Sequence, residues 1–216
     1  MSIKNNLLQI KSTLPEHVTL VAVSKTKPVS DLMEAYEAGQ RIFGENKIQE
    51  MSEKWEQMPK DIQWHMIGHV QTNKVKFMAQ FVSLIHGVDS LKLLQEINKQ
   101  ALKHNRIIDC LLQMHIAEEE TKFGLDEQEL ASLLSSSEFE EMKNIRIVGL
   151  MGMATFTDNK DQIKKEFSHL KSIFDQLTIH NSQFTILSMG MSGDYQLAIE
   201  CGSTMVRIGS SIFGGR

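Results

Sequence analysis

A lysine stands at the point where a strongly apolar segment of the chain ends. Segment 18–24 is largely aliphatic, and Lys25 follows it directly. Such a segment predicts a short strand buried on both faces, and α/β proteins place their chemistry at the carboxyl ends of such strands. Partial desolvation there would favour the neutral amine that condenses with an aldehyde to a Schiff base. The alternative is that Lys25 extends into water, and on this residue alone that alternative is favoured.

Two glycine-containing segments follow the last two apolar runs. They are 191–194 (Met-Ser-Gly-Asp) and 209–211 (Gly-Ser-Ser). The loops after strands seven and eight of a β/α barrel commonly hold a phosphate through backbone N–H groups in glycine-permitted turns. The alternative is that Ser192 or Asp194 caps a helix over 194–201. Two adjacent loops at these strands favour a phosphate site.

Arg207 interrupts the apolar run 205–208. Strand alternation directs its side chain to the face opposite Val206 and Ile208. If that face is the interior of a barrel, the guanidinium needs a partner, because an unpaired buried charge is costly. An acceptor nitrogen of a ligand, or a carboxylate such as Glu45, would serve. Pairing with a structural acid between barrel and helices is an equally open alternative.

The ends of the second and third apolar runs carry the remaining candidates. Asn46 follows the second run, and we expect it to cap a helix while its amide faces the barrel mouth. His65 and His69 are four residues apart, a spacing that unites metal ligands on a helix. A strand followed by a glycine turn does not bring them together, so we predict no metal site.

Apolar segments of strand length alternate with amphipathic segments of helical period along the chain. The predicted strands are 18–24, 40–43, 62–67, 82–87, 106–116, 145–153, 184–188 and 204–208. The predicted helices are 5–13, 29–38, 71–80, 90–104, 126–135, 160–180 and 194–201. Eight strands with intervening helices predict an α/β fold, one parallel (β/α)8 or TIM barrel formed by residues 1–216 as a single domain. The first helix would cover the bottom of the barrel or take the place of a full final helix in the outer ring.

The composition excludes several classes of protein. Of 216 residues, 41% are hydrophobic and 23% charged, as in ordinary soluble domains, and the net charge of −4 gives no basic field for nucleic acid. We find no secretory signal and no apolar run that could span a membrane. Cys110 and Cys201 are the only cysteines, which indicates no disulfide framework and a cytoplasmic location. We expect a monomer, because no separate interface domain is visible.

The lysine, the two loops and the arginine together point to pyridoxal 5'-phosphate, an aldehyde with a phosphate and a ring nitrogen. The chain resembles the pyridoxal-phosphate homeostasis proteins, which are single-domain relatives of the alanine racemase N-terminal barrel (pyridoxal-phosphate fold type III). The resemblance rests on the stretches 21–26 (Val-Ala-Val-Ser-Lys-Thr), 43–46 (Phe-Gly-Glu-Asn), 65–74, 188–194 and 207–214.

The resemblance implies a role for each candidate residue. Lys25 would hold the cofactor as an aldimine, Arg207 would contact the pyridine nitrogen, and Asn46 would lie near the phenolic oxygen. The phosphate would be bound by Ser192 and the turn 209–210. The implied cofactor site consists of Lys25, Asn46, Met191, Ser192, Arg207, Gly209 and Ser210. None of these is firmly catalytic, although Lys25 would be so in a racemase.

The expected function is that of a carrier which buffers pyridoxal phosphate in vitamin B6 homeostasis, with little or no turnover and with apo-enzymes as partners. The alternative is a small alanine racemase, which needs two positioned acid/base groups. In the racemases the second group is a tyrosine, and a C-terminal β-domain completes the site. This chain ends soon after its eighth strand, and neither Tyr36 nor Tyr195 is an evident second base. A phosphate-binding barrel without pyridoxal would leave Lys25 and Arg207 unexplained.

Overall fold

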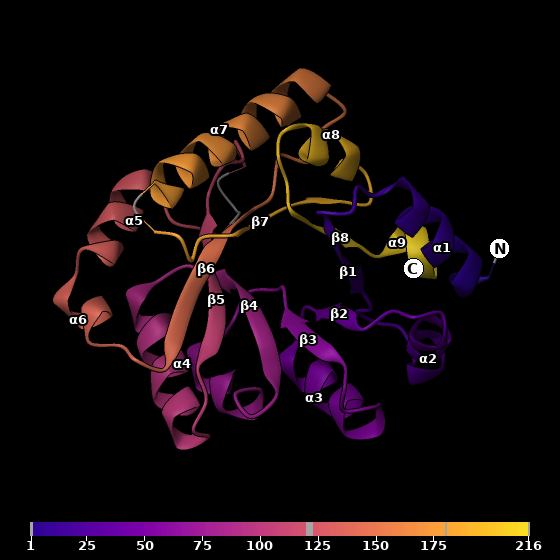
Figure 1. The fold of residues 1–216 in the computed structure, drawn as a ribbon, viewed down its shortest axis with the longest axis horizontal. Helices are drawn as coiled ribbons and strands as arrows, with labels where there is room; N and C mark the ends of the chain where they lie inside the picture. The colour runs from indigo at the N-terminus through magenta and orange to yellow at the C-terminus, as the bar shows by residue number, and fades with distance from the viewer. Residues whose placement is uncertain (1, 120–122, 180, 216) are drawn as a thin grey trace.

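The computed structural model describes residues 2–119, 123–179 and 181–215. In these residues, eight parallel strands hydrogen-bond in chain order and β1 also pairs with β8, which closes a barrel (Figure 1). The predicted (β/α)8 fold class is therefore confirmed. The strands are β1 Thr19–Val23, β2 Ile42–Glu45, β3 Gln63–Met66, β4 Val82–Val88, β5 Ile108–Met114, β6 Ile145–Gly152, β7 Ile186–Met191 and β8 Met205–Ile208.

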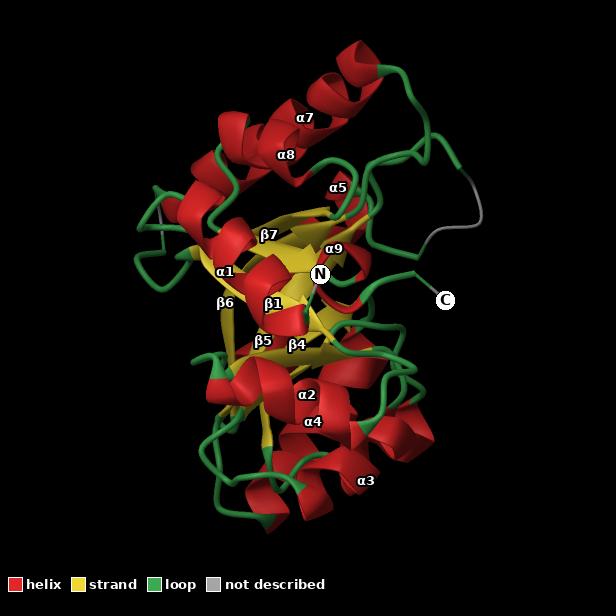
Figure 2. Ribbon diagram, turned by 90° about the vertical axis from the view of Figure 1, so that its right-hand side faces the viewer, coloured by secondary structure: helices red, strands yellow, loops and turns green. Residues whose placement is uncertain are grey.

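Helices surround the barrel, as Figure 2 shows for both sides of the strands. The helices are α1 Ile3–Thr13, α2 Val29–Glu37, α3 Ile48–Gln57, η1 Thr72–Phe77, α4 Leu91–Lys103, α5 Glu127–Leu134, α6 Ser137–Glu140, α7 Lys160–Thr178, α8 Tyr195–Glu200 and α9 Ser210–Phe213.

The predicted helix ranges agree with these bounds to within two residues, with the exceptions below; α3 was predicted only as a helix that begins at Asn46. The helix predicted over 71–80 is wrong, because η1 is a six-residue 3-10 helix. Its Thr72, Asn73 and Val75 are poor α-helix formers, and of its residues only Val75 is buried. The short helices α6 and α9 were not predicted. Residue 180, the last of the helix predicted over 160–180, lies outside the described residues.

The strands are apolar because both of their faces are covered. The outer faces pack against the helices in a large core that includes Phe43, Trp64 and Leu187. The inward positions form a second, smaller apolar cluster that includes Val21 and Leu84. Side-chain alternation along each strand therefore decides which residues face the inside of the barrel.

Helix α1 completes the outer ring where the chain has only the four-residue α9 after β8. It packs against α2 and α9, and the Asn6 side-chain amide donates to the carbonyl of Ile212 at 3.0 Å. This placement is the outer-ring alternative predicted for the first helix.

Two further properties hold for the described ranges. No helix in them is long and apolar enough to cross a membrane. They also contain no group of three or more His, Cys, Asp or Glu side chains placed to hold a metal ion. Cys110 is buried, Cys201 is half-buried, and neither forms a disulfide.

Candidate functional site at the mouth of the barrel

Lys25 lies two residues beyond the end of β1, at the carboxyl ends of the strands. It lines a cavity of about 120 Å³ together with Gly209 and Ser210. It also lines an adjoining cavity of about 590 Å³ together with Asn46. The lysine is half-buried, and its side chain forms no hydrogen bond or ion pair with any described residue. Its amine is thus placed between two of the predicted binding elements.

The residues on either side of this lysine are held by side chains of β2 and α3. The Ser24 hydroxyl donates to Glu45 Oε1 at 2.6 Å, and the Thr26 N–H donates to Glu50 Oε1 at 2.6 Å. Lys54 donates to both carboxylates at 2.7 Å and to the Ser24 carbonyl at 2.8 Å. This group, which we call the Lys54 clamp, fixes the backbone that carries the lysine. No sequence pattern indicates this clamp, because its members come together only through the packing of α3 on β2.

The clamp also holds an unfavourable backbone conformation. Thr26 has a φ of 64°, in the left-handed region that β-branched residues rarely adopt. Such a residue persists only where the surrounding structure over-determines it, and such residues cluster at ligand sites. The hydrogen bond from Thr26 to Glu50 supplies part of that constraint.

Glu45 belongs to the clamp and does not meet Arg207, so the suggested Glu45–Arg207 pair is wrong. Glu45 alternates with Gly44 and shares the outward face of β2 with Phe43, which directs its carboxylate towards α3. Its side chain is fully buried, and Oε2 has no hydrogen-bond partner among the described residues. Burial raises the pKa of Glu45, although the Lys54 charge opposes this.

Arg207 points into the barrel and is 3% exposed. Its Nη1 donates to the Ser188 hydroxyl at 2.5 Å, and its Nη2 donates to the Gly152 carbonyl at 3.1 Å. Burial lowers the pKa of Arg207 to about 10, while the Asp194 charge acts in the opposite direction. The interior alternative predicted for this arginine is confirmed. Its partners inside the barrel are neutral groups that the sequence did not reveal.

The two glycine-containing loops meet as predicted. The Gly209 N–H donates to the Ser192 hydroxyl at 3.2 Å, which joins the loop after β7 to the loop after β8. The backbone N–H groups of Gly193 and Ser210 make no hydrogen bond with a described residue. These amides are available to an anion.

The carboxylate of Asp194 does not cap α8. Asp194 is the residue before the helix, but its side chain makes no capping bond there. Instead it accepts from the Met191 N–H at 2.6 Å and closes the turn. Met191 lies beside Arg207 in the β7–β8 register, with its own backbone donor already used.

Asn46 lies at the mouth but does not cap α3, which corrects the predicted helix start. Lys47 is the capping position of α3, one residue further on, and it makes no side-chain capping bond. Asn46 is held by close backbone packing, since a Cβ on Gly68 would fall 2.4 Å from the Asn46 carbonyl oxygen. Its side-chain amide makes no hydrogen bond with a described residue.

The two histidines of the third strand end point to different places, as the strand geometry predicts. His65 is buried inside the barrel, where its Nδ1 lies 3.0 Å from Nε2 of His86. His69 lies at the rim, with Nδ1 3.4 Å from Asp89 Oδ2 and its ring stacked on Phe123. Neither arrangement resembles a metal site.

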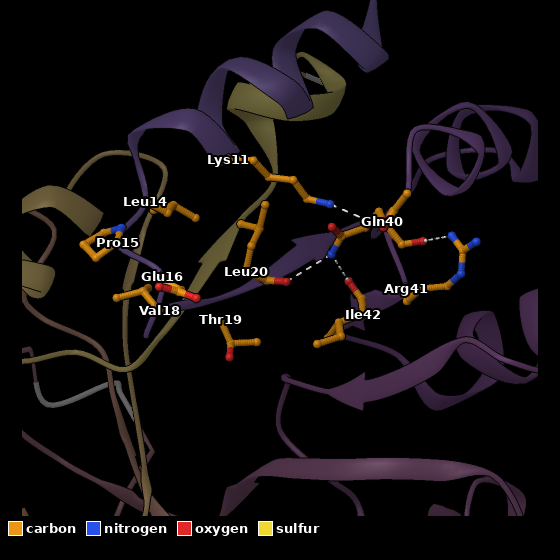
Figure 3. Close-up of a pocket in the computed structure, with 11 residues that line it drawn as sticks. Lys11, Leu14, Pro15, Glu16, Val18, Thr19, Leu20, Gln40, Arg41 and Ile42 are labelled. Atoms are coloured by element: carbon orange, nitrogen blue, oxygen red, sulfur yellow. Dashed lines mark hydrogen bonds between the residues drawn. The ribbon is translucent and has the colours of Figure 1, made fainter.

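A separate cavity of about 360 Å³ lies at the opposite end of the barrel, near the amino ends of β1 and β2 (Figure 3). Gln40 bridges the two strands there, because its Nε2 donates to the carbonyls of Leu20 at 3.0 Å and Ile42 at 2.7 Å. Burial and the Arg41 charge lower the pKa of Lys11 on its wall. Polar groups at this end of a β/α barrel serve stability, so we place the functional site at the Lys25 end.

The comparisons with known proteins agree with this geometry. Residues 1–216 match the family model described as "Alanine racemase, N-terminal domain". The chain belongs to this family. An alanine racemase from E. faecalis shares the fold with a TM-score of 0.77 at 16% identity, and the match covers 99% of this chain and 58% of the racemase.

Within that family, the similar curated relatives are pyridoxal phosphate homeostasis proteins, and the resemblance to this group is confirmed. The protein of Pasteurella multocida is 37% identical over 100% of this chain and 98% of its own length. The protein of Aquifex aeolicus is 39% identical over 91% of this chain and 86% of its own. PipY of Synechococcus elongatus is 33% identical, with TM-scores of 0.92 without PLP and 0.89 with PLP bound; each match covers 99% of this chain and 100% of PipY.

Proposed function

We propose that residues 1–216 form one domain that binds pyridoxal 5'-phosphate through Lys25 and carries it in vitamin B6 homeostasis. The observation that carries the proposal is the position of Lys25, which borders the cavity of Gly209 and Ser210 on one side and that of Asn46 on the other. The PipY structure with PLP bound and the homeostasis relatives support it.

The groups at the mouth fit the chemistry of this cofactor. Lys25 would hold the cofactor through its amine, and the aldehyde of the cofactor would supply the carbon of that linkage, with loss of one water. Backbone N–H groups and hydroxyls of the two loops suit a phosphate, and a buried guanidinium suits a ring nitrogen that only accepts. The residues that would surround the cofactor are Asn46, Met191, Ser192, Arg207, Gly209 and Ser210.

The placement of the tyrosines favours a carrier over an alanine racemase. The Tyr36 hydroxyl donates to Asp61 at 2.9 Å, and Asp61 precedes β3 at the amino end of the barrel, far from Lys25 along the strands. Tyr195 starts α8 and packs, half-buried, against the core. We propose little or no racemisation of alanine. Robust turnover by the purified protein that disappears in Lys25→Ala would contradict this.

The first test is the visible absorption of the purified protein with added pyridoxal phosphate. The wild type should develop the band of a Schiff base, and Lys25→Ala should not. Lys27→Ala is the matched control, because Lys27 lines the same two cavities and should leave the band intact. A band that survives in Lys25→Ala would assign the linkage to another lysine, and no band in any variant would contradict pyridoxal phosphate binding.

We further propose that the protein is a cytoplasmic monomer that supplies apo-enzymes. Two unpaired cysteines are consistent with a reducing compartment. Light scattering after gel filtration measures the mass directly. Loaded protein can be mixed with an apo-enzyme in the presence of a trap for free pyridoxal phosphate. Reactivation that resists the trap indicates direct delivery, and reactivation that the trap abolishes indicates buffering only.

A further inference from the structure

The interior of the barrel has two chemically distinct layers. The lower layer is apolar and consists of Val21, Leu84, Leu111, Val148, Met151 and Met205. The next inward positions towards the mouth carry polar side chains on five strands. Gln113 on β5 donates to the Phe123 carbonyl at 3.0 Å, and the four others hydrogen-bond to one another. These four are His65 on β3, His86 on β4, Ser188 on β7 and Arg207 on β8.

The four polar side chains form one continuous line of hydrogen bonds. Arg207 Nη1 lies 2.5 Å from Ser188 Oγ, Ser188 Oγ lies 3.0 Å from His86 Nδ1, and His86 Nε2 lies 3.0 Å from His65 Nδ1. None of the four is more than 3% exposed. A buried network of this kind orients its members strongly when every atom has a partner.

Arg207, at one end of this line, determines which atom donates and which accepts in each of its hydrogen bonds. A guanidinium only donates, so Ser188 Oγ accepts from Arg207 and has one proton to give. No other acceptor for that proton is found among the described residues, so it goes to His86 Nδ1. His86 then carries its proton on Nε2 and donates it to His65 Nδ1. Both imidazoles are neutral in this arrangement, which agrees with burial lowering the pKa of His65 to about 3 and that of His86 well below its usual value.

We propose that His86, supported by His65 and acting through Ser188, is a positioning residue that orients the Arg207 guanidinium towards a ring nitrogen bound at the mouth. The bonds to Ser188 and Gly152 restrain both terminal nitrogens of Arg207, so the guanidinium plane cannot rotate freely. This inference rests on the proposed function for the identity of the ligand. The line of hydrogen bonds from Arg207 through Ser188 and His86 to His65, which we call the relay, does not depend on the ligand.

The first test needs no ligand. Side-chain ¹⁵N NMR of histidine-labelled protein reports the tautomer and charge of each imidazole. We expect His65 and His86 to be neutral at pH 7, with the proton on Nε2 in both. Assignment comes from the spectra of His65→Leu and His86→Gln. A proton on Nδ1 of either ring, or a charged ring, would overturn the relay.

The second test separates positioning from general support of the fold. It compares the affinity for pyridoxal phosphate with the affinity for its 1-deaza analogue, in which a C–H replaces the ring nitrogen. His86→Phe and Ser188→Ala should each weaken binding of pyridoxal phosphate by about tenfold, the scale of one lost hydrogen bond to a charged group. Binding of the deaza analogue should change less than about threefold, because it has no acceptor for Arg207.

Two controls make the comparison decisive. His86→Gln can accept from Ser188 and donate to His65, so it should recover part of the lost affinity. Val148→Ala removes contacts from the apolar layer and should weaken both ligands alike, if at all. Equal losses of both ligands in His86→Phe would show a structural role and overturn the proposal. If the wild type binds neither ligand, the proposed function fails, and the NMR result still decides the relay.

Discussion

At the residue scale, the turn that carries Lys25 contains strain that can be removed by one substitution. Thr26 at φ 64° costs about 1–3 kcal/mol, and glycine adopts this conformation freely. Part of the gain is offset by the larger entropy of glycine in the unfolded chain. We expect Thr26→Gly to raise the free energy of unfolding by about 1 kcal/mol in urea titrations.

A second left-handed residue provides the control for this prediction. Asn105, at φ 52°, lies in the turn before β5, and asparagine tolerates this region better than threonine. Asn105→Gly should therefore stabilise the protein by less than Thr26→Gly. A lower free energy of unfolding in Thr26→Gly would show that the threonine side chain stabilises the fold by more than its left-handed backbone destabilises it.

The individual site residues show how far a sequence can be interpreted. Strand alternation placed Arg207 on the face opposite Val206 and Ile208, because a period of two is a local property. It left open whether that face is the interior of the barrel, which the closed sheet decides. The partner of Arg207 was not predictable, because Ser188 becomes its neighbour only through the pairing of β7 with β8. Glu45 lies beyond the predicted second strand, 40–43, so alternation did not assign its face. In the structure β2 extends to Glu45, which shares the outward face of the strand with Phe43.

At the element scale, the Lys54 clamp makes α3 part of the candidate site around Lys25. Lys54 and Glu45 are 5% and 0% exposed, so removal of the lysine leaves a buried carboxylate with no cation beside it. Breaking a buried pair in this way costs about 3–5 kcal/mol. We expect Lys54→Met to lose this amount of unfolding free energy. Lys99→Met, at an exposed ion pair on α4, should change it by less than about 0.5 kcal/mol.

The loss in Lys54→Met should depend on pH in a defined direction. Burial raises the pKa of Glu45 in the folded protein, so the folded state holds a proton more tightly than the unfolded chain does. Stability from such a group is lost as pH rises through its folded pKa. The loss of unfolding free energy in Lys54→Met should therefore be smaller at pH 5 than at pH 8. An equal loss at both values would mean that Glu45 is not the group left uncompensated.

The elements themselves were predictable where a single signal was strong. Buried strands are recognisable as apolar runs, and α4 is recognisable by its helical period. In the structure Ser90 caps α4, because its hydroxyl accepts from the Leu93 N–H at 3.3 Å. The region 71–80 has a helical pattern too, but with the poor α-helix formers Thr72, Asn73 and Val75 it forms only a six-residue 3-10 helix. The four-residue α6 is shorter than the window over which a period can be recognised.

At the scale of the whole molecule, cofactor binding should appear as added stability. A ligand that binds only the folded state stabilises it by about 2.7 kcal/mol at a hundredfold excess over its dissociation constant. For a chain of 216 residues this corresponds to a rise in Tm of roughly 5–10 °C. Wild type heated with pyridoxal phosphate should show the rise, and Lys25→Ala should show much less. An equal rise in Tm in the wild type and in Lys25→Ala would mean that Lys25 contributes little to the binding free energy.

The polar layer inside the barrel should make the whole fold sensitive to acid. An unfolded histidine takes up a proton near pH 6.5, whereas burial lowers the pKa of His65 in the folded protein to about 3. Between these values the unfolded chain binds more protons, so stability falls as pH falls. Each such histidine contributes about 1.4 kcal/mol per pH unit to the slope.

Urea titrations at several pH values between 7.5 and 5 test this dependence. His65→Leu should reduce the slope below pH 6.5 by about one proton, that is about 1.4 kcal/mol per pH unit, whatever its effect at pH 7.5. Leu84→Ala gives the control, because it changes the interior of the barrel without removing a titrating group, and it should leave the slope unchanged. A slope that His65→Leu does not alter would mean that His65 becomes charged in the folded protein over the same pH range as in the unfolded chain. In that range the hydrogen bond from His86 to His65 Nδ1 would be impossible, because a charged imidazole has no acceptor.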